Sequence, residues 1–196
     1  LSLGTQAGTL VAHTIDLNLT HLNNTGAIEA DATLFVSASD SLVNSGSLFA
    51  GSDLTVKAGA LIDNRGDMLA RGNLALRVLD NTRVSPLQVN NQGTGLMQAL
   101  GAFTLGTDAE RWVNFTQTQD AAVLADSINL KAVGVDNDGL MQAATTLTAL
   151  GLNALENRGF GSLLAGTTMA VGAGTLGNQG TCLLYTSDAA DERSSV

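Results

Sequence analysis

Short segments in which every second residue is apolar recur along the chain. Leu34 and Val36 are separated by one residue, and Leu54 and Val56 repeat that spacing 20 residues later. A period of two predicts short strands with one buried face. Asn-x-Gly triplets lie between these segments, and both residues tolerate the positive φ of tight turns. The pattern therefore predicts strands joined by tight turns, and no helix.

Three successive windows align without a gap: Leu22–Ala38, Leu42–Ala58 and Ile62–Val78. Their common pattern is Leu-x-Asn-x-Gly-x-Ile/Leu-x-Ala-Gly-x-x-Leu-x-Val-x-Ala, with some positions varied between copies. Four types of residue recur every 20 positions, which chance does not produce over three copies. These repeat columns are Asn24, Asn44 and Asn64; Gly26, Gly46 and Gly66; Ala30, Ala50 and Ala70; and Leu34, Leu54 and Leu74.

Weaker copies extend the repeat from Gly8 to Thr181, giving about nine units. Two stretches are irregular, residues 79–91 and residues 109–121. The first contains the only proline, Pro86, which has no amide hydrogen for a β-ladder. We expect residues 79–91 to form a lateral loop, and residues 109–121, with Trp112 and Phe115, to form a second irregular segment.

A single 20-residue unit cannot bury its own apolar face, but stacked units can. The predicted fold is therefore all-β, a parallel β-helix (solenoid) of about nine turns spaced ~4.8 Å apart. In such a stack the asparagine column is predicted to form an amide ladder, each side chain donating to the next. The alanine column suits a tight inward corner, where a larger side chain would overpack.

The last 15 residues, Cys182–Val196, do not follow the repeat and contain the only cysteine and the only tyrosine. Their sequence resembles the translation of a sequencing adapter. We interpret residues 182–196 as such an artefact and expect them to be disordered, so that the β-helical segment comprises residues 1–181.

The charge balance weighs against nucleic-acid binding. The chain has 9 Lys and Arg against 18 Asp and Glu, a formal charge of −9, whereas phosphate backbones require basic stripes. One series of arginines recurs every six residues, but it alternates with aspartates and has no aromatic residues between its members, which is typical of a solvated surface. Its members are Arg65, Arg71, Arg77 and Arg83.

The repeat resembles the 20-residue haemagglutinin repeat of the filamentous haemagglutinin family. These proteins are large two-partner secretion exoproteins of Gram-negative bacteria, among them adhesins and contact-dependent growth inhibition toxins, some with roles in virulence. The resemblance covers residues 1–181 and is most specific in residues 17–78. It implies a right-handed β-helical shaft that is secreted and exposed on the cell surface. It also implies an outer-membrane transporter as partner, recognised through a region absent here, and carries over no catalytic residue.

Arg65, Gly66 and Asp67 spell the tripeptide that integrins recognise, and some adhesins of the resembled family carry one. They are therefore a candidate adhesive site. The alternative is an ordinary turn, because Gly66 belongs to the glycine column and its two neighbours align with variable positions.

Other motifs favour structure over chemistry, and no cofactor or metal is expected. Residues 172–177 match Gly-x-Gly-x-x-Gly but do not precede a helix. Residues 136–139 resemble the start of a calcium loop, yet Leu147 stands where the loop needs Glu. His13 and His21 have no cysteine partner for a zinc site or a catalytic pair.

The sequence thus predicts a non-enzymatic stalk segment of an adhesin or contact-dependent inhibition toxin, with an unidentified receptor or glycan as its surface partner. The alternative is a polysaccharide-processing enzyme of the pectin-cleaving type, which also uses a β-helix. Such an enzyme needs charged residues gathered from neighbouring turns, whereas Asp31, Asp53 and Asp126 lie singly in turns. A third hypothesis is a carbohydrate-binding surface near Trp112 and Phe115.

Overall fold

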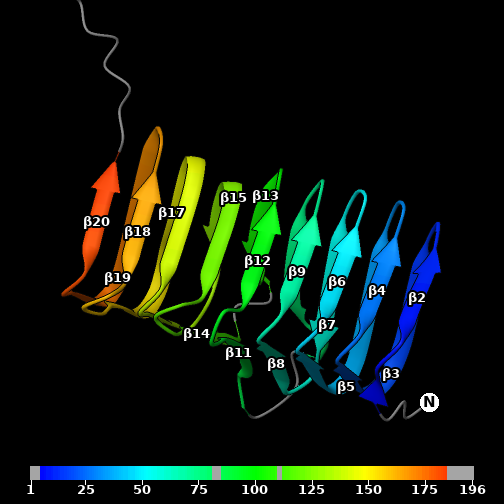
Figure 1. The fold of residues 1–196 in the computed structure, drawn as a ribbon. Helices are drawn as coiled ribbons and strands as arrows, with labels where there is room; N and C mark the ends of the chain where they lie inside the picture. Colours follow the sequence, from blue (N-terminus) through cyan, green and yellow to red (C-terminus); the bar gives the residue numbers. More distant parts are fainter. Residues whose placement is uncertain (1–4, 81–84, 110–111, 185–196) are drawn as a thin grey trace, which may run out of the picture.

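The computed structural model describes residues 5–80, 85–109 and 112–184. These residues contain 20 β-strands and no helix, and the strand pairs between turns are all parallel. The strands wind into a β-solenoid of about nine turns, which confirms the predicted fold class. Figure 1 shows the turns side by side along a rod that runs from the N-terminal turn (blue) to the C-terminal one (red).

Each turn has three faces, and corresponding strands of successive turns lie on the same face. Face 1, whose strands stand upright in Figure 1, contains β2 (Thr9–Ala12), β4 (Ala27–Ala30), β6 (Ser47–Ala50), β9 (Asp67–Ala70), β12 (Leu96–Ala99), β18 (Ser162–Ala165) and β20 (Thr181–Leu184). Face 2 contains β7 (Leu54–Ala58), β10 (Leu74–Val78) and β13 (Ala102–Leu105). Face 3 contains β1 (Thr5–Gln6), β8 (Leu61–Asn64), β11 (Leu87–Asn91), β14 (Val113–Gln117) and β16 (Gly134–Asn137).

Five longer strands continue around a corner from one face to the next. The strands that join faces 2 and 3 are β3 (Ile15–Asn24), β5 (Leu34–Asn44) and β19 (Thr168–Asn178). Face 1 continues into face 2 through β15 (Ala122–Leu130), and β17 (Leu140–Asn157) passes along all three faces.

Apolar side chains form continuous columns inside the rod. Leu54 pairs with Leu34 in the preceding turn and with Leu74 in the next, and all three are buried. The same column continues through Phe103, Ile128 and Leu147. Burial of apolar surface is the main favourable term in folding, and here it arises between turns. The stack is therefore the unit of stability.

The alanine column lies at the end of face 1, where the chain turns towards face 2. Ala30, Ala50 and Ala70 are buried and in register. The column continues through Ala99, Ala125, Ala143 and Ala165. A small side chain is thus kept at this corner in seven successive turns, as expected where a larger one would overpack.

The first irregular segment is shorter than predicted. Leu87–Asn91, predicted above to be part of a loop, forms strand β11, which pairs with β8. The physical reason is that Leu87, Val89 and Asn91 alternate inward and fill the columns of face 3. Residues 81–84 of the predicted loop lie outside the described part of the chain.

The second irregular segment is also partly regular, because Val113–Gln117 forms strand β14 and buries Val113 and Phe115. Residues 110–111 lie outside the described part of the chain. The predicted disorder of residues 182–196 is wrong for Cys182–Leu184, which pair with Leu163–Ala165 in strand β18, and residues 185–196 lie outside the described part of the chain. The open edge of β18 offers backbone partners to any extended segment beside it.

Candidate functional site: the amide ladder and the outer faces

A line of carboxamide side chains runs inside the rod along face 3. Nδ2 of Asn24 donates to Oδ1 of Asn44 at 2.8 Å, and Nδ2 of Asn44 donates to Oδ1 of Asn64 at the same distance. The predicted ladder is therefore present, and every bond in it points towards the C-terminus. It continues through Asn91, Gln117, Asn137, Asn157 and Asn178.

The sequence pattern missed Asn91 and Gln117 as ladder members. Asn91 follows Asn64 by 27 residues and Gln117 follows Asn91 by 26, so neither has the 20-residue spacing. The longer Gln117 side chain makes ladder bonds of 3.3 and 3.2 Å, against 2.8 Å for most asparagine pairs. The available signal was the apolar alternation before each residue, which ends at Asn91 and Gln117 as it does at Asn64.

The glycine column lies against this ladder and allows the turns to approach closely. A Cβ atom at Gly66 would lie 2.1 Å from the carbonyl oxygen of Gly46, and one at Gly46 would lie 2.0 Å from that of Gly26. The ladder nitrogens also donate to glycine carbonyls, as Asn64 does to Gly66 at 2.9 Å. The Asn-x-Gly motif is thus one structural device, in which the glycine gives the space and the asparagine gives the bonds.

The tripeptide Arg65–Asp67 is part of a stacked turn. The amides of Arg65 and Gly66 both donate to the carbonyl of Asn44, at 2.8 and 3.2 Å. The exposed guanidinium of Arg65 pairs with the buried carboxylate of Asp63 at 3.1 Å. The turn therefore holds the tripeptide against the rod, and its adhesive role stays a prediction.

Two of the carboxylates named for the enzyme hypothesis, Asp31 and Asp126, lie too far apart to act as a pair. Asp31 and Asp126 both follow the alanine column but lie four turns apart, roughly 19 Å at ~4.8 Å per turn. Paired glycosidase carboxylates are typically separated by about 5–9.5 Å. Asp53 lies in a turn before face 2, where Oδ1 accepts from the backbone amide of Asn73 at 2.7 Å. These groups complete turns of the chain.

Two other titratable side chains, His21 and Asp136, have local structural partners. Nδ1 of His21 lies 3.0 Å from the hydroxyl of Ser41 and 3.3 Å from Asp40. Asp136 pairs with Arg158, and this hydrogen bond and charge raise the pKa of the arginine. Within the described residues, no three His, Cys, Asp or Glu side chains gather as metal ligands.

The glycine-rich match and the two aromatic residues named above are placed by the strands of the rod. Residues 172–177, the Gly-x-Gly-x-x-Gly match, lie within strand β19. Phe115 is buried in the core, so the carbohydrate surface predicted near Trp112 and Phe115 is wrong for the phenylalanine. Trp112 is 41% exposed just before strand β14.

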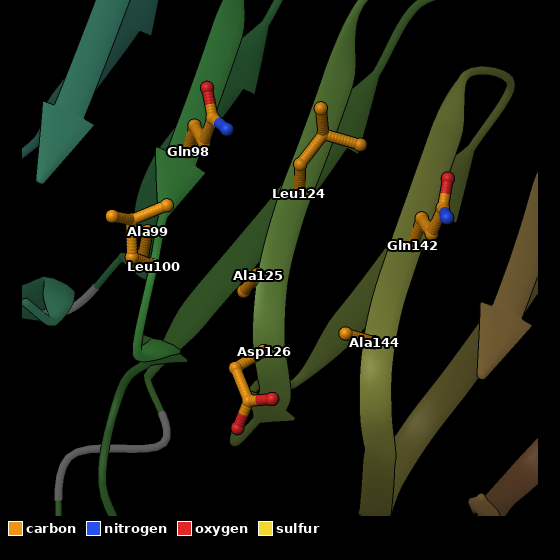
Figure 2. Close-up of a pocket in the computed structure, with 8 residues that line it drawn as sticks. All are labelled: Gln98, Ala99, Leu100, Leu124, Ala125, Asp126, Gln142 and Ala144. Carbon is orange, nitrogen blue, oxygen red and sulfur yellow. The ribbon is translucent and has the colours of Figure 1, made fainter. Parts of the chain in front are cut away.

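Shallow hollows mark the outside of the rod. A hollow of about 310 Å³ on face 1 is lined by Gln98, Leu124, Asp126 and Gln142 among others (Figure 2). A second one of about 250 Å³ lies on face 3 over Gly134. The first combines amide, carboxylate and aliphatic groups from three turns.

Comparisons with protein-family models, with curated proteins and with solved structures found no match. No helix among the described residues is long and apolar enough to cross a membrane. The family resemblance therefore stays a prediction from the repeat.

Proposed function

We propose that this chain is a non-enzymatic stalk segment of a large secreted bacterial surface exoprotein. The observation that carries the proposal is that the described turns use their inward positions for stacking, with the same columns of leucine, alanine and asparagine types from turn to turn. Such a rod gains reach in steps of ~4.8 Å per turn. Its role is to hold other regions of the exoprotein away from the cell.

The direction of the hydrogen bonds supports this mechanical role. Backbone bonds between paired strands, and the ladder bonds from Asn24 onward, connect one turn to the next. A force applied along the rod therefore acts at the same time on the backbone bonds of all three faces and on the ladder bond between two turns. Separating two turns requires these bonds to break together, and the newly exposed amides would have to be solvated.

The parent protein in this proposal is an adhesin or a contact-dependent growth inhibition toxin on the surface of a Gram-negative bacterium. A two-partner outer-membrane transporter exports it through a region outside this segment. Its outer faces make weak contacts with a cell-surface receptor or glycan. The basis for this part is the resemblance of the repeat.

The test is to change the length of the stalk by whole turns within the full-length exoprotein. Residues 45–64 form one complete turn, so ten tandem copies would add about 48 Å while keeping every column in register. We expect the secreted rod to lengthen by that amount in electron micrographs, with the distal region still accessible to antibody on intact cells. The matched control inserts the same number of residues as a Gly/Ser sequence, which should add no rigid length.

Loss of display with the register-preserving insertion, or equal rod lengths in both variants, would contradict the stalk. Incubation of the chain with polygalacturonate separates the enzyme hypothesis, since measurable cleavage would replace the proposed function.

A further inference from the structure

The outward side chains of face 1 form a stripe along the rod that is apolar in most of its turns. At the third position of the face 1 strands from β6 to β18, the outward residues Phe49, Leu69, Leu124 and Leu164 are apolar, and Gln98 and Gln142 occupy the turns between them. The corresponding surface of face 3 is polar, with Asn90, Thr116, Asp136 and Glu156 in one column. Apolar side chains gathered on one outer face and not on another are typical of an interaction surface.

This stripe is hollowed into one groove. A hollow of about 160 Å³, lined by Phe49, Leu69 and Arg71, shares Gln98 and Leu100 with the 310 Å³ hollow. Figure 2 shows the 310 Å³ hollow, in which side chains from three neighbouring turns lie side by side. Leu100, at the junction of the two hollows, is 64% exposed. The groove therefore spans five turns, from β6 to β17, with an exposed leucine at its centre.

Opposite charges lie on either side of that leucine. Arg71, Leu100 and Asp126 each follow a residue of the alanine column, so they occupy the same position in three successive turns. Arg71 lies one turn before Leu100, over the ring of Phe49 at 5.7 Å. Asp126 lies one turn after it. The groove is thus basic on one side, acidic on the other, and symmetric in spacing about Leu100.

We propose that face 1 binds face 1 of a second copy of this chain, with the two rods antiparallel and related by a twofold axis along β12. A twofold interface is self-complementary. Because successive turns have equal spacing, Leu100 faces the partner's Leu100, and Arg71 faces the partner's Asp126. The symmetry generates this ion pair twice. Leu69 meets the partner's Leu124, and Gln98 meets the partner's Gln98.

The interface is small, so the pairing is weak and reversible. Four residues at ~3.3 Å and five turns at ~4.8 Å give a groove of roughly 300 Å² per copy, below the roughly 800 Å² of a standard interface. The formal charge of −9 also opposes association, and salt near physiological strength screens that repulsion. This inference goes beyond the stalk proposal, because it adds lateral pairing between stalks.

Sedimentation equilibrium of the 196-residue chain tests the pairing, at concentrations up to about 1 mM and about 0.15 M salt. A reducing agent is present because Cys182 is an exposed thiol. The variants are Arg71→Glu, Asp126→Arg and the double variant with both changes. Lys57→Glu is the matched control. Lys57 lies on face 2, outside the proposed interface, and like Arg71 it is a cation over a phenylalanine ring, that of Phe35 at 5.8 Å.

We expect wild type and Lys57→Glu to form a monomer–dimer equilibrium. Each single charge reversal on face 1 places like charges at both symmetric contacts and should weaken dimerisation about tenfold or more. The double variant exchanges the two charges and should restore wild-type association. Circular dichroism verifies that all variants fold.

A wild-type chain that stays monomeric would overturn the proposal. The same conclusion follows if both single variants associate as wild type does, as end-to-end stacking would predict. Failure of the double variant to recover would exclude the Arg71–Asp126 pairing.

Discussion

Replacement of Asn44 by alanine removes one member from the middle of the amide ladder. The Asn44 side chain donates to Oδ1 of Asn64 at 2.8 Å and to the carbonyl of Asp67 at 3.0 Å, and it accepts from Asn24. In the variant Oδ1 of Asn64 stays buried without this donor, which costs about 1–3 kcal/mol, and each other lost bond contributes about 0.5–1.5 kcal/mol. We expect the free energy of unfolding to fall by about 3 kcal/mol.

The matched control is Asn23→Ala in the preceding turn of the rod, where Asn23 stands one residue before the ladder residue Asn24 in strand β3. Asn23 points outward, and its side chain makes one long, exposed bond of 3.4 Å to Thr5. Its replacement should change the free energy of unfolding by about 0.5 kcal/mol or less. Urea denaturation followed by circular dichroism compares the three proteins. Equal midpoints for the two variants would refute the ladder as a source of stability.

Two further pairs of variants test the columns and the spacing of the turns. Leu54→Asp buries an unpaired carboxylate between two leucines and should lower the free energy of unfolding by several kcal/mol. Ser52→Asp, in the bend just before strand β7, should lower it by about 0.5 kcal/mol or less. Equal urea midpoints would mean that Leu54 does not face inward. Gly46→Ala drives a methyl group to 2.0 Å from the carbonyl of Gly26 and should cost about 1–3 kcal/mol or more. At Gly134 the nearest atom to a new Cβ lies at 3.4 Å, so Gly134→Ala should leave the melting temperature nearly unchanged; similar losses at both sites would refute the close approach of turns.

The fold was predictable because the stack imposes the same physical demand on every turn. An inward position must be apolar in each turn, so Leu34, Leu54 and Leu74 recur at one spacing and reveal the column. The asparagine ladder was predictable for the same reason, since an amide that donates to its copy in the next turn must stand at the same position. Three regular turns in residues 22–78 were enough to indicate both features.

Other features depend on turn length, which the repeat does not constrain. Extra residues between β10 and β11 change the spacing but leave the inward columns of the two strands intact. Because Leu87–Asn91 and Phe115 do not keep the 20-residue spacing, the repeat pattern predicted irregular segments for them. The groove of face 1 was also missed, because outward positions vary from turn to turn, as Gln98 between Leu69 and Leu124 shows, and leave no repeated column in the sequence.

Buried amide side chains join successive turns of the rod. Hydrogen exchange of side-chain amides in the folded chain, followed by NMR, measures how well these bonds protect them. We expect the NH₂ group of Asn44, which is fully buried, to exchange far more slowly than that of the outward Asn23. Exchange of both groups at the same fast rate would contradict the ladder, and with it the stacked register of the rod.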